Sequence, residues 1–238
     1  MYSIKKKAAI VLIILYTVGY YLWIAFFNGN DMSRIIISNT LQTIPPLFVF
    51  ILLFKTYVKV KWQRERFWLL LTIGCGSYLL SQLIWDYFEI VLGIYNPAFS
   101  ISALLWPATT ISYIIALSIK YWQKKNVKSA KIFVVDTLTI MCIAVAVTWL
   151  YSIQPAFDNM TSRNILSDIV YLVYPVFNLV CLFASVNLYF SLGQQDIERK
   201  PLYIICLSFL VMFVANSIYS HLSVLEIYAS WTSCHGAV

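Results

Sequence analysis

Long apolar runs alternate with short polar stretches along the whole chain of 238 residues. Each run is about 20 residues long, which is the length that an α-helix needs to cross a bilayer. The pattern predicts an all-α fold, a polytopic membrane helix bundle with seven transmembrane helices. We expect these helices at residues 8–27, 35–57, 67–91, 98–119, 132–151, 165–192 and 201–220.

Composition supports this interpretation and limits the domain organisation. Hydrophobic residues make up 61% of the chain and charged residues only 11%. A soluble domain would carry about 25% charged residues. The polar stretches between the runs are too short to fold as soluble domains. Residues 1–238 are therefore expected to form a single integral membrane domain, with the lipid bilayer as its first partner.

The positions of the positive charges predict how the helices are oriented. Of the 17 basic residues, 15 fall before the first run or in every second loop after it. These are Lys5, Lys6, Lys7, Lys55, Lys59, Lys61, Arg64, Arg66, Lys120, Lys124, Lys125, Lys128, Lys131, Arg199 and Lys200. Because basic loops remain in the cytoplasm, the N-terminus is predicted inside and, after seven crossings, the C-terminus outside. The net charge of +7 follows from this bias and does not indicate a nucleic-acid partner.

Carboxylates inside the apolar runs are the candidates for a signal or ligand site. An ionisable residue at mid-membrane costs about 2.5–3.5 kcal/mol on insertion scales and less near the helix ends. Four such residues are expected in the outer half of the membrane: Asp86, Glu89, Asp168 and Glu226. They could line a ligand or ion site, or respond to protons. Alternatively, carboxylates at helix ends simply reach water among the lipid headgroups. Asp86 and Glu89 share one helical face with Gln82, at spacings of three and four residues.

Other polar and proline residues within the runs are expected to shape the helices. Prolines remove backbone donors and predict kinks, which serve packing or act as hinges. They are Pro45, Pro46, Pro107 and Pro175. Asparagine and glutamine side chains at this depth hold helices together through hydrogen bonds more often than they bind ligands. The residues assigned to this role are Asn39, Gln42, Asn178 and Asn216.

The sequence offers little for catalysis or metal binding. It contains no nucleophile-elbow, zinc-protease or phosphate-loop motif. Four of the five cysteines lie in apolar runs and are interpreted as small buried hydrophobic residues. Cys234 and His235 are adjacent but have no further ligands near them in the sequence. We therefore expect no catalytic residue, no cofactor and no metal.

Three stretches of the chain carry a resemblance to a known family. They are 80–93 (LSQLIWDYFEIVLG) with Pro97 and Ser100, 135–138 (VDTL) with 170–179 (VYLVYPVFNL), and 214–219 (VANSIY) with 228–231 (YASW). Together they resemble the multi-helix membrane sensor region at the N-terminus of bacterial GGDEF/EAL proteins, which make or degrade cyclic di-GMP. The resemblance covers most of the chain from about residue 67 onward. It implies a sensory role in a bacterial cell membrane.

The chain departs from that family at several positions. Asn178 and Asn216 stand where the family often has aspartate, and Ala103-Leu104 replaces a polar pair. The matching positions are Glu89, Asp136, Tyr174 and Pro175. Family members continue past the Ser-Trp pair into a further helix and a cytoplasmic catalytic domain. Here the sequence ends seven residues after Trp231 without a GGDEF or EAL motif, so we expect a sensor that is truncated before its output domain and is not an enzyme.

Three hypotheses for function remain open from the sequence. The first is a sensory region that passes helix movement to a partner, either a second copy of the chain or another membrane or signalling protein. The second is a small transporter or permease whose path is lined by the kinked helices. The third is a structural membrane protein without a ligand, in which the carboxylates affect only stability.

Overall fold

The computed structural model describes residues 2–26, 32–60, 66–93, 101–124, 134–154, 165–191 and 199–224. In these residues the chain forms seven α-helices and one π-helical segment, and no strand. They are α1 (Tyr2–Phe26), α2 (Met32–Val60), α3 (Arg66–Ile90), α4 (Ile101–Lys124), α6 (Val134–Thr148), η2 (Trp149–Ile153), α8 (Ile165–Ser191) and α9 (Arg199–Val224). The all-α class is thus confirmed, and each predicted helix has a counterpart.

The ends of the helices follow from local chemistry. Helix α3 ends at Ile90, and Gly93 lies three residues further on. Gly93 has a φ of 63°, a left-handed conformation that glycine reaches without steric cost. Just before it, the amides of Val91 and Leu92 both donate to the carbonyl oxygen of Tyr87, at 3.0 and 3.3 Å. Helix α9 contains Pro201 in its first turn, where a backbone N–H would have no partner within the helix.

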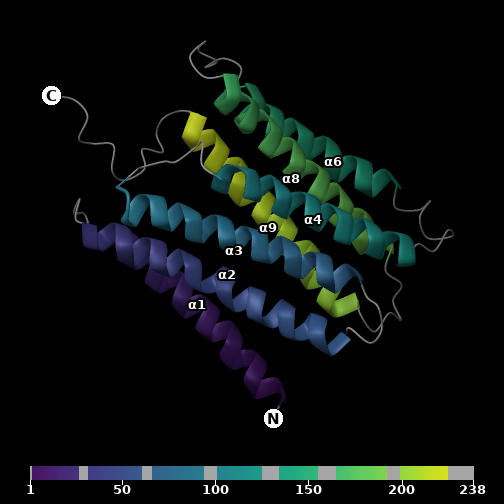
Figure 1. Ribbon diagram of the computed structural model, residues 1–238. Helices are drawn as coiled ribbons and strands as arrows, with labels where there is room; N and C mark the ends of the chain where they lie inside the picture. The colour runs from purple at the N-terminus through teal and green to yellow at the C-terminus, as the bar shows by residue number, and fades with distance from the viewer. Residues whose placement is uncertain are drawn as a thin grey trace.

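The helices lie side by side and alternate in direction (Figure 1). Across the molecule the order is α1, α2, α3, α4, α8 and α6, and α9 packs against α8. Helices that are consecutive in the chain are therefore mostly neighbours, except that α8 lies between α4 and α6. This alternation places the ends of α2, α4 and α8 at the same end of the bundle as the beginnings of α3, α6 and α9.

The core lies where α3, α4, α8 and α9 meet. Its buried residues are Phe67, Leu71, Ala116, Leu117, Cys181, Leu188, Leu202, Cys206 and Phe209. A smaller cluster joins α6, α8 and α9 through Ala144, Leu182 and Phe213. Helices α1 and α2 contribute none of these buried side chains, so they form the outer edge of the bundle.

Three of the described helices are long and apolar enough to cross a membrane, in the segments Ile35–Val60, Arg66–Ile90 and Lys200–Ile218. Shorter apolar segments occur at Val11–Tyr20, Asp136–Tyr151 and Pro175–Ser191. Helix α4 is in neither group. Many large hydrophobic side chains on these helices are exposed, which suits contact with lipid chains better than contact with water. The fold is thus compatible with a membrane protein.

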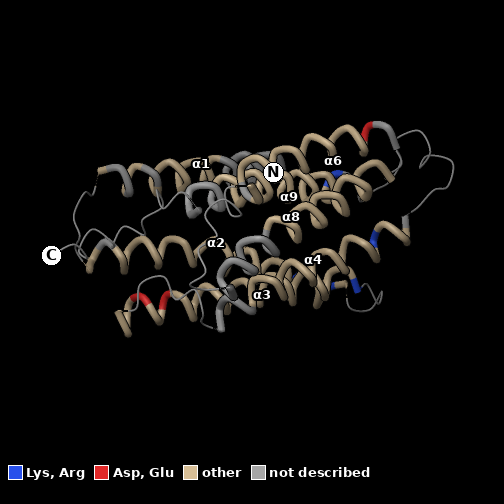
Figure 2. The backbone as a smooth tube through the Cα atoms, turned by 90° about the horizontal axis from the view of Figure 1, so that it is seen from above, with Lys and Arg blue, Asp and Glu red and all other residues tan. Residues whose placement is uncertain are grey.

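Charged residues separate along the bundle. Figure 2 shows the Lys and Arg residues gathered toward one end of the described helices and the two acidic residues of α3 toward the opposite end. Asp136, in the first turn of α6, lies at the same end as the basic residues. Asp86 and Glu89 are therefore set apart from the basic side chains that the structure describes.

Candidate functional site

The candidate site lies where the last turns of α3 pack against the first half of α2. Asn39 Nδ2 donates to Glu89 Oε2 at 2.8 Å. One turn further along α2, the hydroxyl of Thr43 donates to Asp86 Oδ2 at 2.5 Å. Gln82 Nε2 donates to the other oxygen of Asp86 at 2.9 Å. Each carboxylate is thus held by neutral amide or hydroxyl groups.

The pairing follows from two matching helical spacings. Asn39 and Thr43 are four residues apart on α2, and Gln82, Asp86 and Glu89 are four and three residues apart on α3. Residues at these spacings share a face of their helix. Because the two helices run in opposite directions, the earlier residue of α2 meets the later residue of α3. Asn39 and Gln82 are buried at 6% and 8% exposure, so this contact lies between the helices rather than on the surface.

The Thr43 hydroxyl has one hydrogen to donate and two acceptor oxygens within reach. Its Oγ1 lies 2.5 Å from Asp86 Oδ2 and 3.0 Å from the backbone oxygen of Asn39. A hydroxyl donates one hydrogen bond at a time, so it serves the carboxylate or the backbone. When Asp86 carries a proton, Asp86 can donate to Thr43, and Thr43 can donate to the Asn39 carbonyl. The contact therefore has two complete hydrogen-bond arrangements that differ by one proton.

A second set of hydrogen bonds joins the same part of α2 to α1. The hydroxyl of Tyr16 donates to the carbonyl oxygen of Leu41. Gln42 Nε2 donates to the Tyr20 hydroxyl at 2.6 Å. Leu41 is four residues before Pro45, which has no N–H to offer it. Tyr16 thus supplies the donor that the proline removes.

These polar contacts differ from those elsewhere in the bundle. Most serine and threonine hydroxyls bond to the carbonyl four residues earlier in their own helix, as Thr72, Thr109 and Thr148 do. Such bonds satisfy the hydroxyl without joining two helices. By contrast, Asn39 and Thr43 bond to the carboxylates across helices, and Tyr16 and Gln42 join α1 to α2, so these contacts depend on how α1, α2 and α3 are placed.

The remaining sequence-predicted site residues fall elsewhere. Asp168 is on α8, where its side chain is not described, and Glu226 lies outside the described residues. The structure thus brings together Asp86, Glu89 and Gln82, and a shared pocket with Asp168 and Glu226 stays a prediction. The sequence predicted a helix-joining role for Asn39 and Gln42, and in the structure Asn39 bonds to α3 and Gln42 bonds to α1. Sequence reasoning missed that Asn39 and Thr43 bond to these carboxylates, and it missed the role of Tyr16 and Tyr20. The four-residue spacing within each pair is the signal that could have suggested it.

The residues expected to kink or pack the helices lie within continuous helices. Pro45, Pro46, Pro107 and Pro175 are each followed and preceded by helical residues. Asn216 Nδ2 on α9 donates to Asn178 Oδ1 on α8 at 3.2 Å. Trp106, next to Pro107, packs against Trp85 of α3 with ring centroids 5.3 Å apart.

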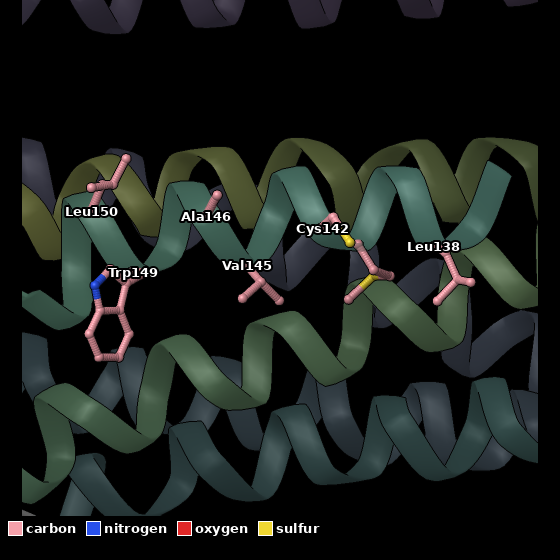
Figure 3. A pocket seen from close by; sticks show the side chains of 7 residues that line it. Leu138, Cys142, Val145, Ala146, Trp149 and Leu150 are labelled. Atoms are coloured by element: carbon pink, nitrogen blue, oxygen red, sulfur yellow. The ribbon is translucent and has the colours of Figure 1, made fainter. Parts of the chain in front are cut away.

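An apolar hollow follows α6 and η2, well separated in sequence from the carboxylates (Figure 3). Its lining residues are Leu138, Met141, Cys142, Val145, Ala146, Trp149 and Leu150. It presents almost no polar group that could select a ligand, whereas ligand sites combine apolar walls with a few placed polar groups. Among the described residues, no group of three or more His, Cys, Asp or Glu side chains could hold a metal ion.

Comparison of the chain with protein-family models, with curated proteins and with solved structures finds no match. The class of protein is therefore defined from the fold and from the contact between α2 and α3. They define an all-α helical protein, compatible with a membrane location, with two carboxylates bonded between helices.

Proposed function

We propose that this chain is the membrane-embedded sensory region of a bacterial signalling protein, of the kind found in proteins that metabolise cyclic di-GMP. The observation that carries the proposal is the contact of Asp86 and Glu89 with Thr43 and Asn39. Carboxylates at membrane depth are costly, and residues that bear such a cost usually serve a function. Here the carboxylates join two helices, so a change at either one alters how the helices fit together.

The proposed topology has seven crossings with the N-terminus in the cytoplasm of a bacterial cell. The alternating directions of the helices support it, because they carry the described basic residues to one end of the bundle. These residues include Lys55, Lys59, Arg66, Lys120 and Lys200. A basic end is retained in the cytoplasm, so Asp86 and Glu89 then lie toward the outside.

The two hydrogen-bond arrangements of Thr43 favour sensing over a purely structural role. A signal shifts a protein between two states only if it interacts differently with each of them. Protonation of Asp86, or a polar solute that displaces Thr43 from it, would select one arrangement over the other. The contact would then relay this choice as a movement of α2 against α3, and from there to a partner protein.

Among the described residues, no other charged side chain faces Asp86 and could change which hydrogen-bond arrangement Thr43 adopts. On its own helix the nearest ionisable neighbour is Glu89, which Asn39 holds. On α2 the remaining charged residue of this half is Arg34, whose side chain lies outside the described part of the structure. Residues 101–110 of α4 include no ionisable side chain.

The full chain in lipid nanodiscs tests this proposal. Acidification of the buffer is expected to change amide hydrogen exchange in α2 and α3, and Asp86→Asn is expected to abolish that change. The matched control is Asp136→Asn, since Asp136 is exposed at the opposite end of the bundle. It should leave the response intact.

Three results would contradict the proposal. One is equal loss of the response in both variants, which would mean that the Asp86 contact is not its source. Another is saturable uptake of a solute by proteoliposomes that depends on Asp86 or Glu89, which would make the chain a transporter. Turnover of GTP or cyclic di-GMP by the purified chain would also contradict the proposal.

A further inference from the structure

Helix α1 is held to the bundle by hydrogen bonds more than by packing. Its side chains from Val11 to Leu15 are exposed at 53–66%, and Phe26 is exposed at 79%. None of these side chains belongs to the buried core of the molecule. Its main neighbour among the described helices is α2. Figure 1 shows α1 diverging from α2 toward the N-terminus. Apolar side chains exposed in a bilayer meet lipid chains of similar polarity, so they favour neither docking nor separation.

Two tyrosines of α1 take part in hydrogen bonds with α2. Tyr16 and Tyr20 are four residues apart and so share a face of α1. Tyr16 donates to the carbonyl of Leu41, and Tyr20 accepts from Gln42 at 2.6 Å. Because Pro45 leaves the Leu41 carbonyl without its helical partner, docking of α1 satisfies an acceptor that hydrocarbon cannot.

The same short segment of α2 also holds the carboxylates. Asn39 and Thr43 bond to α3, whereas Leu41 and Gln42 bond to α1. These four residues lie within two turns, directly before the two prolines. A missing helical hydrogen bond makes a helix easier to bend at that point. The contacts to α1 and the contacts to α3 therefore share one easily bent stretch of backbone.

We propose that α1 is a detachable helix whose docking on α2 is coupled, through residues 39–46, to the hydrogen-bond state of Asp86 and Glu89. In the docked state, Tyr16 completes the backbone of α2 and fixes the position of Thr43 against Asp86. Loss of the Asp86 contact lets the segment shift and weakens the docking of α1. The idea that this coupling transmits a signal rests on the proposed sensory function. The equilibrium between docked and undocked α1 does not depend on that function.

Distances between spin labels on α1 and α2 test the inference in the full chain in nanodiscs. Suitable positions are Leu12 and Phe48, which are exposed on the two helices. The labels are attached through encoded non-natural residues, so the native cysteines stay unchanged. The unaltered chain should give one short distance. The double variant Tyr16→Phe/Tyr20→Phe should lose most of this population to longer distances.

The matched control is Thr17→Val. The Thr17 hydroxyl bonds to Ile13 within α1 itself, so its loss should leave the distance unchanged. An unchanged distance in the tyrosine variant, or an equal shift in Thr17→Val, would overturn the docking role of the tyrosines.

Pro45→Ala gives a test that does not rely on removing an interaction from the protein. An alanine restores the N–H that can bond to Leu41 within α2. Tyr16→Phe should then shift the distance much less in the Pro45→Ala background than alone. An equal shift in both backgrounds would show that Tyr16 does not act through the Leu41 carbonyl.

Coupling is tested by Asp86→Asn and Glu89→Gln with the same two labels. Both substitutions together should move population to the longer distance, and Asp136→Asn should not. If the distance stays unchanged, the coupling is wrong even where the tyrosines hold α1. If the distance responds but proteoliposomes show uptake that depends on Asp86, the coupling stands and the sensory function fails.

Discussion

Gly74 has no side chain, and this lets α3 and α4 approach each other closely. A Cβ at this position would lie 2.6 Å from Cε1 of Tyr113 and 3.2 Å from the carbonyl oxygen of Thr109. The ring of Tyr113 is itself packed edge-on against Phe209 of α9, with centroids 5.3 Å apart. The ring therefore has little freedom to move aside, and the contact between α3 and α4 depends on this glycine.

Gly74→Ala is accordingly expected to destabilise the protein. Overpacking of a well-packed core costs about 1–3 kcal/mol, and the better helix propensity of alanine returns about 1 kcal/mol. Because the added Cβ would lie 2.6 Å from a confined ring, we expect a cost in the upper part of that range and a net loss of stability. Equilibrium unfolding in mixed detergent micelles measures the difference. Gly19→Ala is the control, because a Cβ on Gly19 of α1 meets nothing within 4 Å. A control that is destabilised as much as Gly74→Ala would contradict this account.

At the same scale, the sequence predicted part of the candidate site. Helical spacing alone placed Gln82, Asp86 and Glu89 on one face, and their hydrogen bonds to one another and to α2 agree with that. The sequence also predicted that Asn39 joins helices, but it identified neither Asn39 nor Thr43 as a partner of the carboxylates. Spacing within a helix defines a face but not the helix that packs against it, so cross-helix partners depend on the tertiary arrangement.

Among whole elements, α8 and α9 illustrate how polar groups join helices. Asn178 is buried at 4% exposure, and its Oδ1 accepts from Asn216. Cys206 of α9 also donates to the backbone oxygen of Ser185 on α8, at 3.0 Å. Hydrogen bonds of this kind add to the apolar packing of Cys181 and Leu188 between the same helices.

Asn178→Leu is expected to lower the stability of this pair. Interhelical hydrogen bonds in membrane proteins contribute about 0.6 kcal/mol on average, so a double-mutant cycle with Asn216→Leu should give a coupling free energy of about that size. The control is Asn187→Leu, since Asn187 bonds to Phe183 within α8. A coupling near zero between Asn178 and Asn216, measured by unfolding in micelles, would show that the bond does not hold the helices.

The positions of the helices were predictable, but one local change in winding was not. The predicted helix at 132–151 corresponds to α6 followed by η2, where the winding widens to a π-helix at Trp149–Ile153. The amide of Gln154 donates there to the carbonyl of Trp149, five residues earlier. A continuous apolar run has no signal for this change, because one extra residue in a turn is accommodated by packing against α8 and α9.

For the molecule as a whole, helix direction and the positions of the described charges are both compatible with the proposed orientation. The sequence-based prediction used the loops, whereas the structure adds that the helices alternate and that the described basic side chains gather at one end. The number of crossings could not be settled from hydropathy alone. Helix α4 contains Pro107, Thr109 and Thr110 among its apolar residues and is not among the helices long and apolar enough to cross a membrane, although it packs between α3 and α8.

Cysteine labelling of intact cells tests the proposed orientation. A membrane-impermeant maleimide is expected to label Leu92→Cys from outside and to reach Lys59→Cys only after permeabilisation. Both variants are made in a Cys234→Ser background, because Cys234 would itself be labelled if the C-terminus is outside. Labelling of Lys59→Cys in intact cells, with protection of Leu92→Cys, would reverse the proposed orientation.

If α1 and α2 both cross the membrane, as proposed, the hydrogen bond from Tyr16 to Leu41 also has a consequence for biosynthesis. A ribosome makes α1 before α2, so the donor that Leu41 needs reaches the bilayer before the proline-interrupted helix arrives. If the order were reversed in a circularly permuted chain, α2 would enter the lipid with an unsatisfied carbonyl. Helix α1 is in this sense a built-in insertion partner for α2, and the two helices are expected to enter the membrane as a hairpin.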